Sequence, residues 1–112
     1  MNLLVFITNK VEVIPSILVE FAERGIHGAS VIDCEGMLQA VNAASAEPPP
    51  IFGRLRGFIN SDHEPGKMLI AVLDDENVAI AREAVHKFTG SLDKPNKGIL
   101  FVMPVTYAEG VI

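Results

Sequence analysis

The chain has 112 residues, of which 49% are hydrophobic and 21% charged, as expected for a single domain, 1–112, rather than two. Nine Lys and Arg residues against fourteen Asp and Glu residues give a formal charge of −5, so the sequence lacks the positive field that attracts nucleic acid. No apolar run reaches the roughly 20 residues of a membrane span, no secretory leader is recognisable, and the single Cys34 excludes an internal disulfide. We therefore expect a cytoplasmic protein with no nucleic-acid partner and no membrane insertion.

The first 35 residues predict a strand, a helix and a second strand. Residues 3–7 form an apolar run of strand length. Between 11 and 24, apolar residues recur at helical spacing, and Gly25 follows as a C-cap. This helix would bury Ile14, Ile17, Leu18, Phe21 and Ala22. Residues 29–35 alternate as a strand does, with one face formed by Ser30, Ile32 and Cys34.

The second half of the chain predicts a strand, a helix and a final strand. Residues 67–73 form another apolar run, after which Asp74 and Asp75 offer an N-cap for a helix that ends at Gly90. The inner face of this helix would carry Val78, Ala81, Ala84, Val85 and Phe88. Residues 99–103 form the last strand, which Pro104 ends.

The predicted order, β-α-β-β-α-β, is typical of an α+β ferredoxin-like sandwich with both helices on one face of a four-stranded sheet. In such a sandwich only one sheet face meets the helices, yet the first, third and fourth predicted strands are apolar on both faces. No residues remain for a third layer, so the second face requires another subunit. The sequence therefore predicts self-association through the sheets.

Residues 36–66 form a long insertion between the second and third strands, where connections of about two to six residues are usual. Such a segment could be a mobile recognition loop, a solvent-exposed extension or an arm that packs on a neighbouring subunit, and surface loops on a rigid scaffold favour the first. Within it, Arg54 and Arg56 would project from one side of an extended segment. They could hold a carboxylate or phosphate, or pair with acidic residues of a neighbouring subunit.

The chemically reactive residues form no catalytic constellation, so we do not expect an enzyme. His63 lies between Asp62 and Glu64, but three adjacent side chains of one turn cannot all reach the same metal ion. A positive rim before the last strand is where an anion would bind, and its lysines are Lys87, Lys94 and Lys97. The four methionines are expected mostly at core positions; they are Met1, Met37, Met68 and Met103.

Two segments of the chain resemble the P-II-like signalling proteins, the nitrogen regulatory protein P-II-like family. They are 28–37 (GASVIDCEGM), which leads into the insertion, and 98–105 (GILFVMPV), which follows Thr89-Gly90 and a loop with lysines. The resemblance implies homotrimers of ferredoxin-like subunits whose sheets face inward. It also implies that the insertion 36–66 is a T-loop that docks on a target protein, and that the turn before the last strand is a B-loop that cradles nucleotide phosphates between subunits.

The resemblance further implies a set of ligand-binding residues for an adenine nucleotide. Gly36 and Met37 match the start of the T-loop beside the adenine, and Lys67 falls within one residue of a phosphate-contacting lysine of the family. The residues that bracket the B-loop are Thr89, Gly90, Lys97 and Gly98.

The chain also departs from the nitrogen-sensing members in three ways. Pro95 removes one N–H from the B-loop, and the residues 110–112 do not continue into phosphate-clamping arginines. The only tyrosine is Tyr107, so uridylylation of a T-loop tyrosine is not carried over. These departures weigh against a triphosphate site and leave open a monophosphate, a small anion or a different ligand.

The leading hypothesis is a non-enzymatic, homotrimeric regulatory protein that binds a small anionic effector and changes the conformation of the insertion. Two alternatives stay open at this stage. The same unit could pair its sheets into a small dimeric α+β barrel enzyme, such as a monooxygenase or isomerase. It could also be a trimeric metal-binding protein like the copper-tolerance proteins, although that alternative depends on fold analogy alone.

Overall fold

The computed structural model describes residues 1–37, 40–41, 66–94 and 97–111. Within them the elements follow the predicted order: β1 (Asn2–Thr8), α1 (Val13–Glu23), β2 (Ser30–Cys34), β3 (Gly66–Leu73), α4 (Asp75–Thr89) and β4 (Ile99–Pro104). The four strands form one antiparallel sheet in the order β2-β3-β1-β4. This small α+β arrangement is compatible with a ferredoxin-like fold. Most of the insertion, including Arg54, Arg56 and His63, lies outside the described residues.

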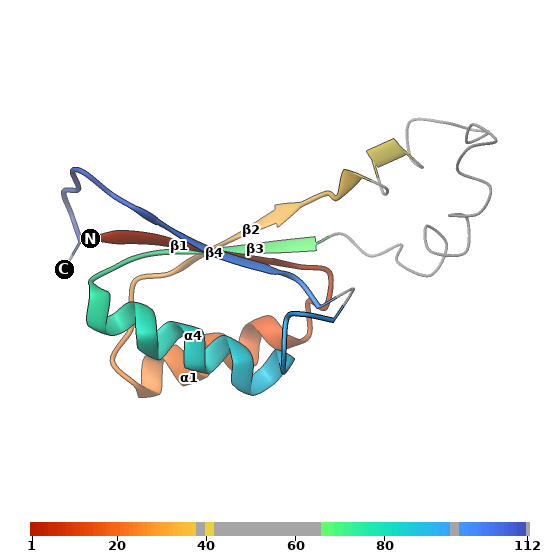
Figure 1. Ribbon diagram of the computed structural model, residues 1–112, viewed down its shortest axis with the longest axis horizontal. Helices are drawn as coiled ribbons and strands as arrows, with labels where there is room; N and C mark the ends of the chain where they lie inside the picture. The colour runs from red at the N-terminus through yellow and green to blue at the C-terminus, as the bar shows by residue number, and fades with distance from the viewer. Residues whose placement is uncertain (38–39, 42–65, 95–96, 112) are drawn as a thin grey trace.

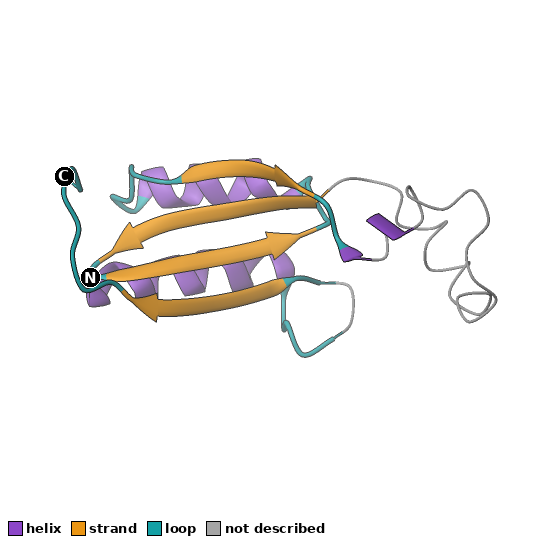
Figure 2. Ribbon diagram, turned by 90° about the horizontal axis from the view of Figure 1, so that it is seen from above, coloured by secondary structure: helices purple, strands orange, loops and turns teal. Residues whose placement is uncertain are grey.

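Both helices cover the same face of the sheet (Figures 1 and 2). The core lies between these two layers because alternate residues of the central strands point toward the helices. Leu4 and Phe6 of β1 and Leu69 of β3 are completely buried there, against Ile17 and Phe21 of α1. Burying a side chain of this size contributes about 1.5–3 kcal/mol.

The helix ends are close to where the sequence places them. The Asp74 side chain accepts a hydrogen bond of 2.8 Å from the Asn77 N–H, so it is the predicted N-cap of α4. Gly25 (φ +90°) and Gly90 (φ +73°) adopt the backbone conformation that favours glycine after a helix. None of the helices in the described part of the chain is long and apolar enough to cross a membrane.

Two details of α1 differ from prediction. The helix begins at Val13 rather than at residue 11, because the first bonds of the segment are those of a tight turn, from the Val13 N–H to the Lys10 carbonyl and from the Ile14 N–H to the Val11 carbonyl. Ala22 is exposed, whereas Leu18 packs against the core. The apolar stripe is therefore narrower than the spacing indicated.

The second face of the sheet carries the other alternate residues, which we call the open face. In it Val5 of β1 lies between its partners Ile70 and Phe101. The remaining members are Leu3 and Ile7 of β1; Gly66, Met68 and Val72 of β3; Ile99 and Met103 of β4; and Ser30, Ile32 and Cys34 of β2. Figure 1 shows no described helix or strand over this face.

The open face is apolar but poorly covered. Ile99 is 62% exposed, Ile32 and Met103 are 44% exposed and Phe101 is 39% exposed. The predicted two-sided apolarity is therefore present in the fold.

The methionines were expected mostly at core positions, and this prediction is wrong in most cases. Met1, Met37 and Met103 are exposed, and Met68 is half-buried on the open face.

Candidate functional site

The hydroxyl of Thr8 joins the end of β1 to two distant segments. Thr8 is 2% exposed. Its Oγ1 donates a hydrogen bond of 3.0 Å to the Lys97 carbonyl and accepts one of 3.0 Å from the Lys10 N–H. Because both bonds are partly buried, breaking either one would leave a backbone group poorly solvated. One side chain thus holds the backbones of Lys10 and Lys97 together.

Lys67 joins the same region through the sheet. It is the Cα partner of Thr8 on β1 and of Asp33 on β2, so it lies between the two. Its ammonium forms an ion pair with the Asp33 carboxylate. We call Lys10, Lys67 and Lys97 the Thr8 lysine cluster. Their backbones come together around Thr8, in a chain whose formal charge is −5.

The backbone that leads from Lys97 into β4 depends on Gly98. This glycine has φ +135°, and a Cβ placed on it would lie 2.7 Å from the Ile7 carbonyl oxygen and 2.9 Å from Phe6 Cε1. No other residue fits at these distances without a shift of the backbone or of the core. The close approach keeps the loop before β4 against β1 and thereby fixes the position of Lys97.

Thr89 and Gly90, which were predicted to bracket a phosphate-binding loop, act in the structure as the end of α4. Thr89 is 6% exposed, and its hydroxyl donates to carbonyl oxygens within the same turn, at 2.8 Å from Val85 and 3.2 Å from Gly90. The Gly90 N–H donates to the His86 carbonyl at 2.9 Å. The Thr89 hydroxyl and the Gly90 N–H thus both bond to backbone carbonyl groups at the C-terminal end of α4.

Gly36 and Met37 follow β2 at the base of the insertion. The Gly36 carbonyl accepts a bond of 2.9 Å from the Ala40 N–H, and Met37 is 75% exposed. Within the described ranges, no hydrogen bond or ion pair joins Gly36, Met37, Thr89 or Gly90 to the Thr8 lysine cluster. Of the predicted site residues, the structure brings together Lys67, Lys97 and Gly98.

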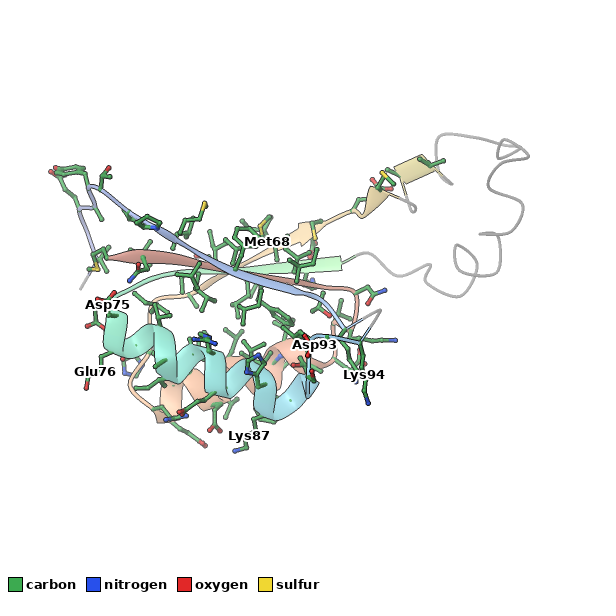
Figure 3. All side chains as sticks on the ribbon, in the orientation of Figure 1. Met68, Asp75, Glu76, Lys87, Asp93 and Lys94 are labelled. Atoms are coloured by element: carbon green, nitrogen blue, oxygen red, sulfur yellow. The ribbon has the colours of Figure 1, made fainter. Side chains whose placement is uncertain are left out.

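The positive rim expected from the sequence is only partly available. Lys87 pairs with Glu20 at 3.1 Å and lies over the Phe88 ring, 5.5 Å from its centroid, so its charge is already engaged. Lys94 is exposed in the loop before β4, and Figure 3 labels it beside Asp93. Lys10 belongs to the candidate site instead, through its N–H bond to Thr8, and nothing in the sequence pattern except its position after a strand predicted this.

The described residues contain no group of three or more His, Cys, Asp or Glu side chains placed to hold a metal ion. A hollow of about 480 Å³ lies at the other end of the sheet, beside His27, Asp74 and Asn77, and no predicted site residue lines it.

The Tyr107 hydroxyl donates to the Glu109 carboxylate, which raises the pKa of this exposed tyrosine.

No model of a known protein family matches the chain, and no curated protein matches it either.

Proposed function

We propose that the chain is a P-II-like regulatory protein without catalytic activity. In this proposal three ferredoxin-like subunits assemble in the cytoplasm through their sheets and bind a small anionic effector in the clefts between them. The effector changes the conformation of the insertion 36–66, which binds a target protein. The observation that carries the proposal is that Thr8 has Lys67 as its cross-strand partner and holds the Lys97 backbone through its buried hydroxyl.

The sheet order supports the ferredoxin-like part of the proposal. In the order β2-β3-β1-β4, each central strand is followed along the chain by a helix that leads to an edge strand, and both helices lie on one face. The insertion would then leave the sheet at the end of β2 and return at the start of β3. That end of the sheet also carries Lys67, so a ligand there would lie next to the base of the insertion.

The open face supports the assembly. Side chains such as Phe101 and Ile99 remain exposed although they continue the apolar pattern of the central strands. Association would remove this area from water at about 25 cal/mol per Å². A trimer with inward-facing sheets covers all three open faces at once. The resemblance to the P-II-like proteins favours that number over two.

The charges support an anionic effector of limited size. Lys67 and Lys97 offer charge-assisted hydrogen bonds, each typically worth about 1.5–3 kcal/mol. Pro95 lacks a backbone N–H, so the loop before the last strand has one donor fewer for additional phosphates. We therefore propose adenosine monophosphate (AMP) or a comparably small anion, rather than ATP, as the effector.

One alternative function shares the observation of the open face. A dimeric α+β barrel enzyme would bury the same residues between two sheets and would enclose a pocket. The mass in solution distinguishes the two assemblies. Light scattering is expected to give about three times 12.1 kDa. A mass of about twice that value favours the barrel, and a stable monomer at micromolar concentration contradicts both.

The effector is tested by calorimetric titration of the purified protein with adenine nucleotides, bicarbonate and divalent metal ions. Lys97→Ala is expected to weaken anion binding by one to two orders of magnitude, since it removes one charge-assisted contact. Lys87→Ala is the control, because Lys87 is engaged with Glu20. Tight, magnesium-dependent ATP binding with weak AMP binding would contradict the proposed effector class.

A further inference from the structure

Lys67 lies between Asp33 on β2 and Thr8 on β1, and its ammonium pairs with the Asp33 carboxylate. We propose that Asp33 is an internal competitor of the anion: it holds Lys67 in the ligand-free protein and is displaced when an anion binds beside Lys10 and Lys97. This inference depends on the proposed function, since it concerns the same anion site. It adds Lys10 as a third contact and gives Asp33 control over the affinity.

The geometry of the sheet places the three side chains in one row. Asp33, Lys67 and Thr8 are successive Cα partners across β2, β3 and β1. Side chains directly opposite on neighbouring strands have Cβ atoms about 4.5–5.5 Å apart. The flexible four-carbon side chain of Lys67 therefore reaches either neighbour with a change of rotamer and no movement of the backbone.

On the β2 side, Lys67 has a weak partner. The Asp33 side chain is 79% exposed and that of Lys67 is 36% exposed. Ion pairs this open to solvent change an equilibrium constant by only about two- to fivefold. Once released, the Asp33 carboxylate is readily hydrated because so much of it already faces water. The pair is therefore easy to exchange.

On the β1 side, Lys10 and Lys97 lie close to Thr8 through their backbones. In the described part of the chain, neither Lys10 nor Lys97 forms an ion pair. Their backbones are nevertheless held together by the Thr8 hydroxyl. An anion at this point would neutralise mutual repulsion and accept charge-assisted bonds from several ammonium groups.

This arrangement favours a compact, multiply charged anion. A phosphate group offers enough oxygens to accept from Lys10, Lys67 and Lys97 together, whereas a single carboxylate or bicarbonate offers fewer. When Lys67 turns toward the phosphate, Asp33 loses its partner. The measured affinity is then the intrinsic affinity reduced by the strength of the Asp33–Lys67 pair.

The test is a calorimetric titration with inorganic pyrophosphate, which carries phosphate charge without adenine. Asp33→Asn is expected to bind about two- to fivefold more tightly than the wild type, by the amount that the pair contributes. Glu76→Gln is the matched control, because it makes the same change of net charge at the first turn of α4, whereas Asp93 and Lys94, in the loop that leads to Lys97, lie near the opposite end of that helix (Figure 3). Its affinity is expected to equal that of the wild type.

A second pair of variants tests the route through Lys67. In a Lys67→Met background, Asp33→Asn is expected to have no effect, since the competition has been removed. A gain that persists in that background would show that Asp33 acts only as a distant charge, and would overturn the proposal.

Lys10→Ala is expected to weaken binding about tenfold. Arg82→Ala, which removes a charge from an exposed position of α4, is its control.

The failure of this inference differs from the failure of the proposed function. Anion binding that depends on Lys97 but is unchanged by Asp33→Asn overturns the competition and leaves the regulatory protein in place. Absence of phosphate, pyrophosphate and nucleotide binding by the wild type overturns both. Circular dichroism of each variant establishes that the fold is intact, so a lost affinity is assigned to the site.

Discussion

The two faces of the sheet are built from the same strands with similar residues, yet their surroundings differ. On the helix-covered face, Leu4, Phe6 and Leu69 are completely buried. On the open face, their neighbours Phe101 and Ile99 are 39% and 62% exposed. The covered face accounts for the fold of one chain. The open face carries apolar side chains that no described helix or strand covers, and this is the surface that the proposed assembly would bury.

Residues that look alike in the sequence can lie on different faces of the sheet. Leu4 and Ile70 both lie in apolar runs, and the sequence does not show which face of the sheet each occupies. The structure places Leu4 under the helices and Ile70 on the open face. Substitutions on the two faces should therefore have separable consequences.

The largest contrast is expected from a charge on each face. Leu4→Asp buries a carboxylate without a partner, which costs several kcal/mol, and we expect it to abolish folding. Ile70→Asp should leave a folded chain that no longer associates, because its carboxylate remains accessible to water. Circular dichroism and light scattering of the two proteins measure this. A folded Leu4→Asp trimer would contradict the assignment of the faces.

A matched pair of truncations gives the next largest effect. Phe6→Ala removes a ring that is 0% exposed and is expected to lower the free energy of unfolding by about 3–5 kcal/mol. Phe101→Ala should change the stability of the isolated chain by about 1 kcal/mol or less and weaken association instead. Urea unfolding at several protein concentrations separates the stability of the chain from the strength of association, since only association depends on protein concentration. Equal losses for both variants would show that the faces do not differ energetically.

A smaller effect is expected at the edge of the covered face. Thr8→Val keeps the shape of the side chain but removes both hydrogen bonds of its hydroxyl, to Lys97 and from Lys10. Leaving these backbone groups without partners should cost about 1–3 kcal/mol. The same variant should also weaken anion binding, because the two lysines are no longer held together. Thr8→Ser, which retains the hydroxyl, is the control for both measurements.

The smallest effect is expected at the N-terminal end of α4, one of the two helices that cover the sheet. Asp74→Ala removes the N-cap that accepts from the Asn77 N–H, and we expect a loss of about 1 kcal/mol. Asp74→Ser should restore most of it, since serine is also a favourable N-cap. Thermal unfolding measures both. An unchanged melting temperature for Asp74→Ala would mean that packing alone positions α4.

Local patterns predicted the fold better than they predicted the candidate site. The alternation of Ser30, Ile32 and Cys34 and the cap at Asp74 were confirmed, because each depends on residues within a few positions of one another. The start of α1 was misplaced by two residues, since apolar spacing does not distinguish a preceding turn from a helix.

The contacts that define the candidate site were not predictable in the same way. The bond between Thr8 and Lys97 joins residues 89 positions apart, and no pattern in the sequence encodes it. The Asp33–Lys67 pair depends on the register between β2 and β3, which the sequence cannot fix across an insertion. Lys97 was identified as part of a positive rim, but Lys10 needed the fold to bring it to the same place.

The first and last described segments meet at one end of the sheet, where the Val105 N–H donates to the Met1 carbonyl at 3.0 Å. β1 runs from there to Thr8, so the Thr8 lysine cluster lies a full strand length away, about 20 Å at 3.3 Å per residue. An affinity tag or a surface attachment at either chain end would therefore leave the cluster accessible. Sensor chips and fluorescent fusions that use these ends should report ligand binding without blocking it.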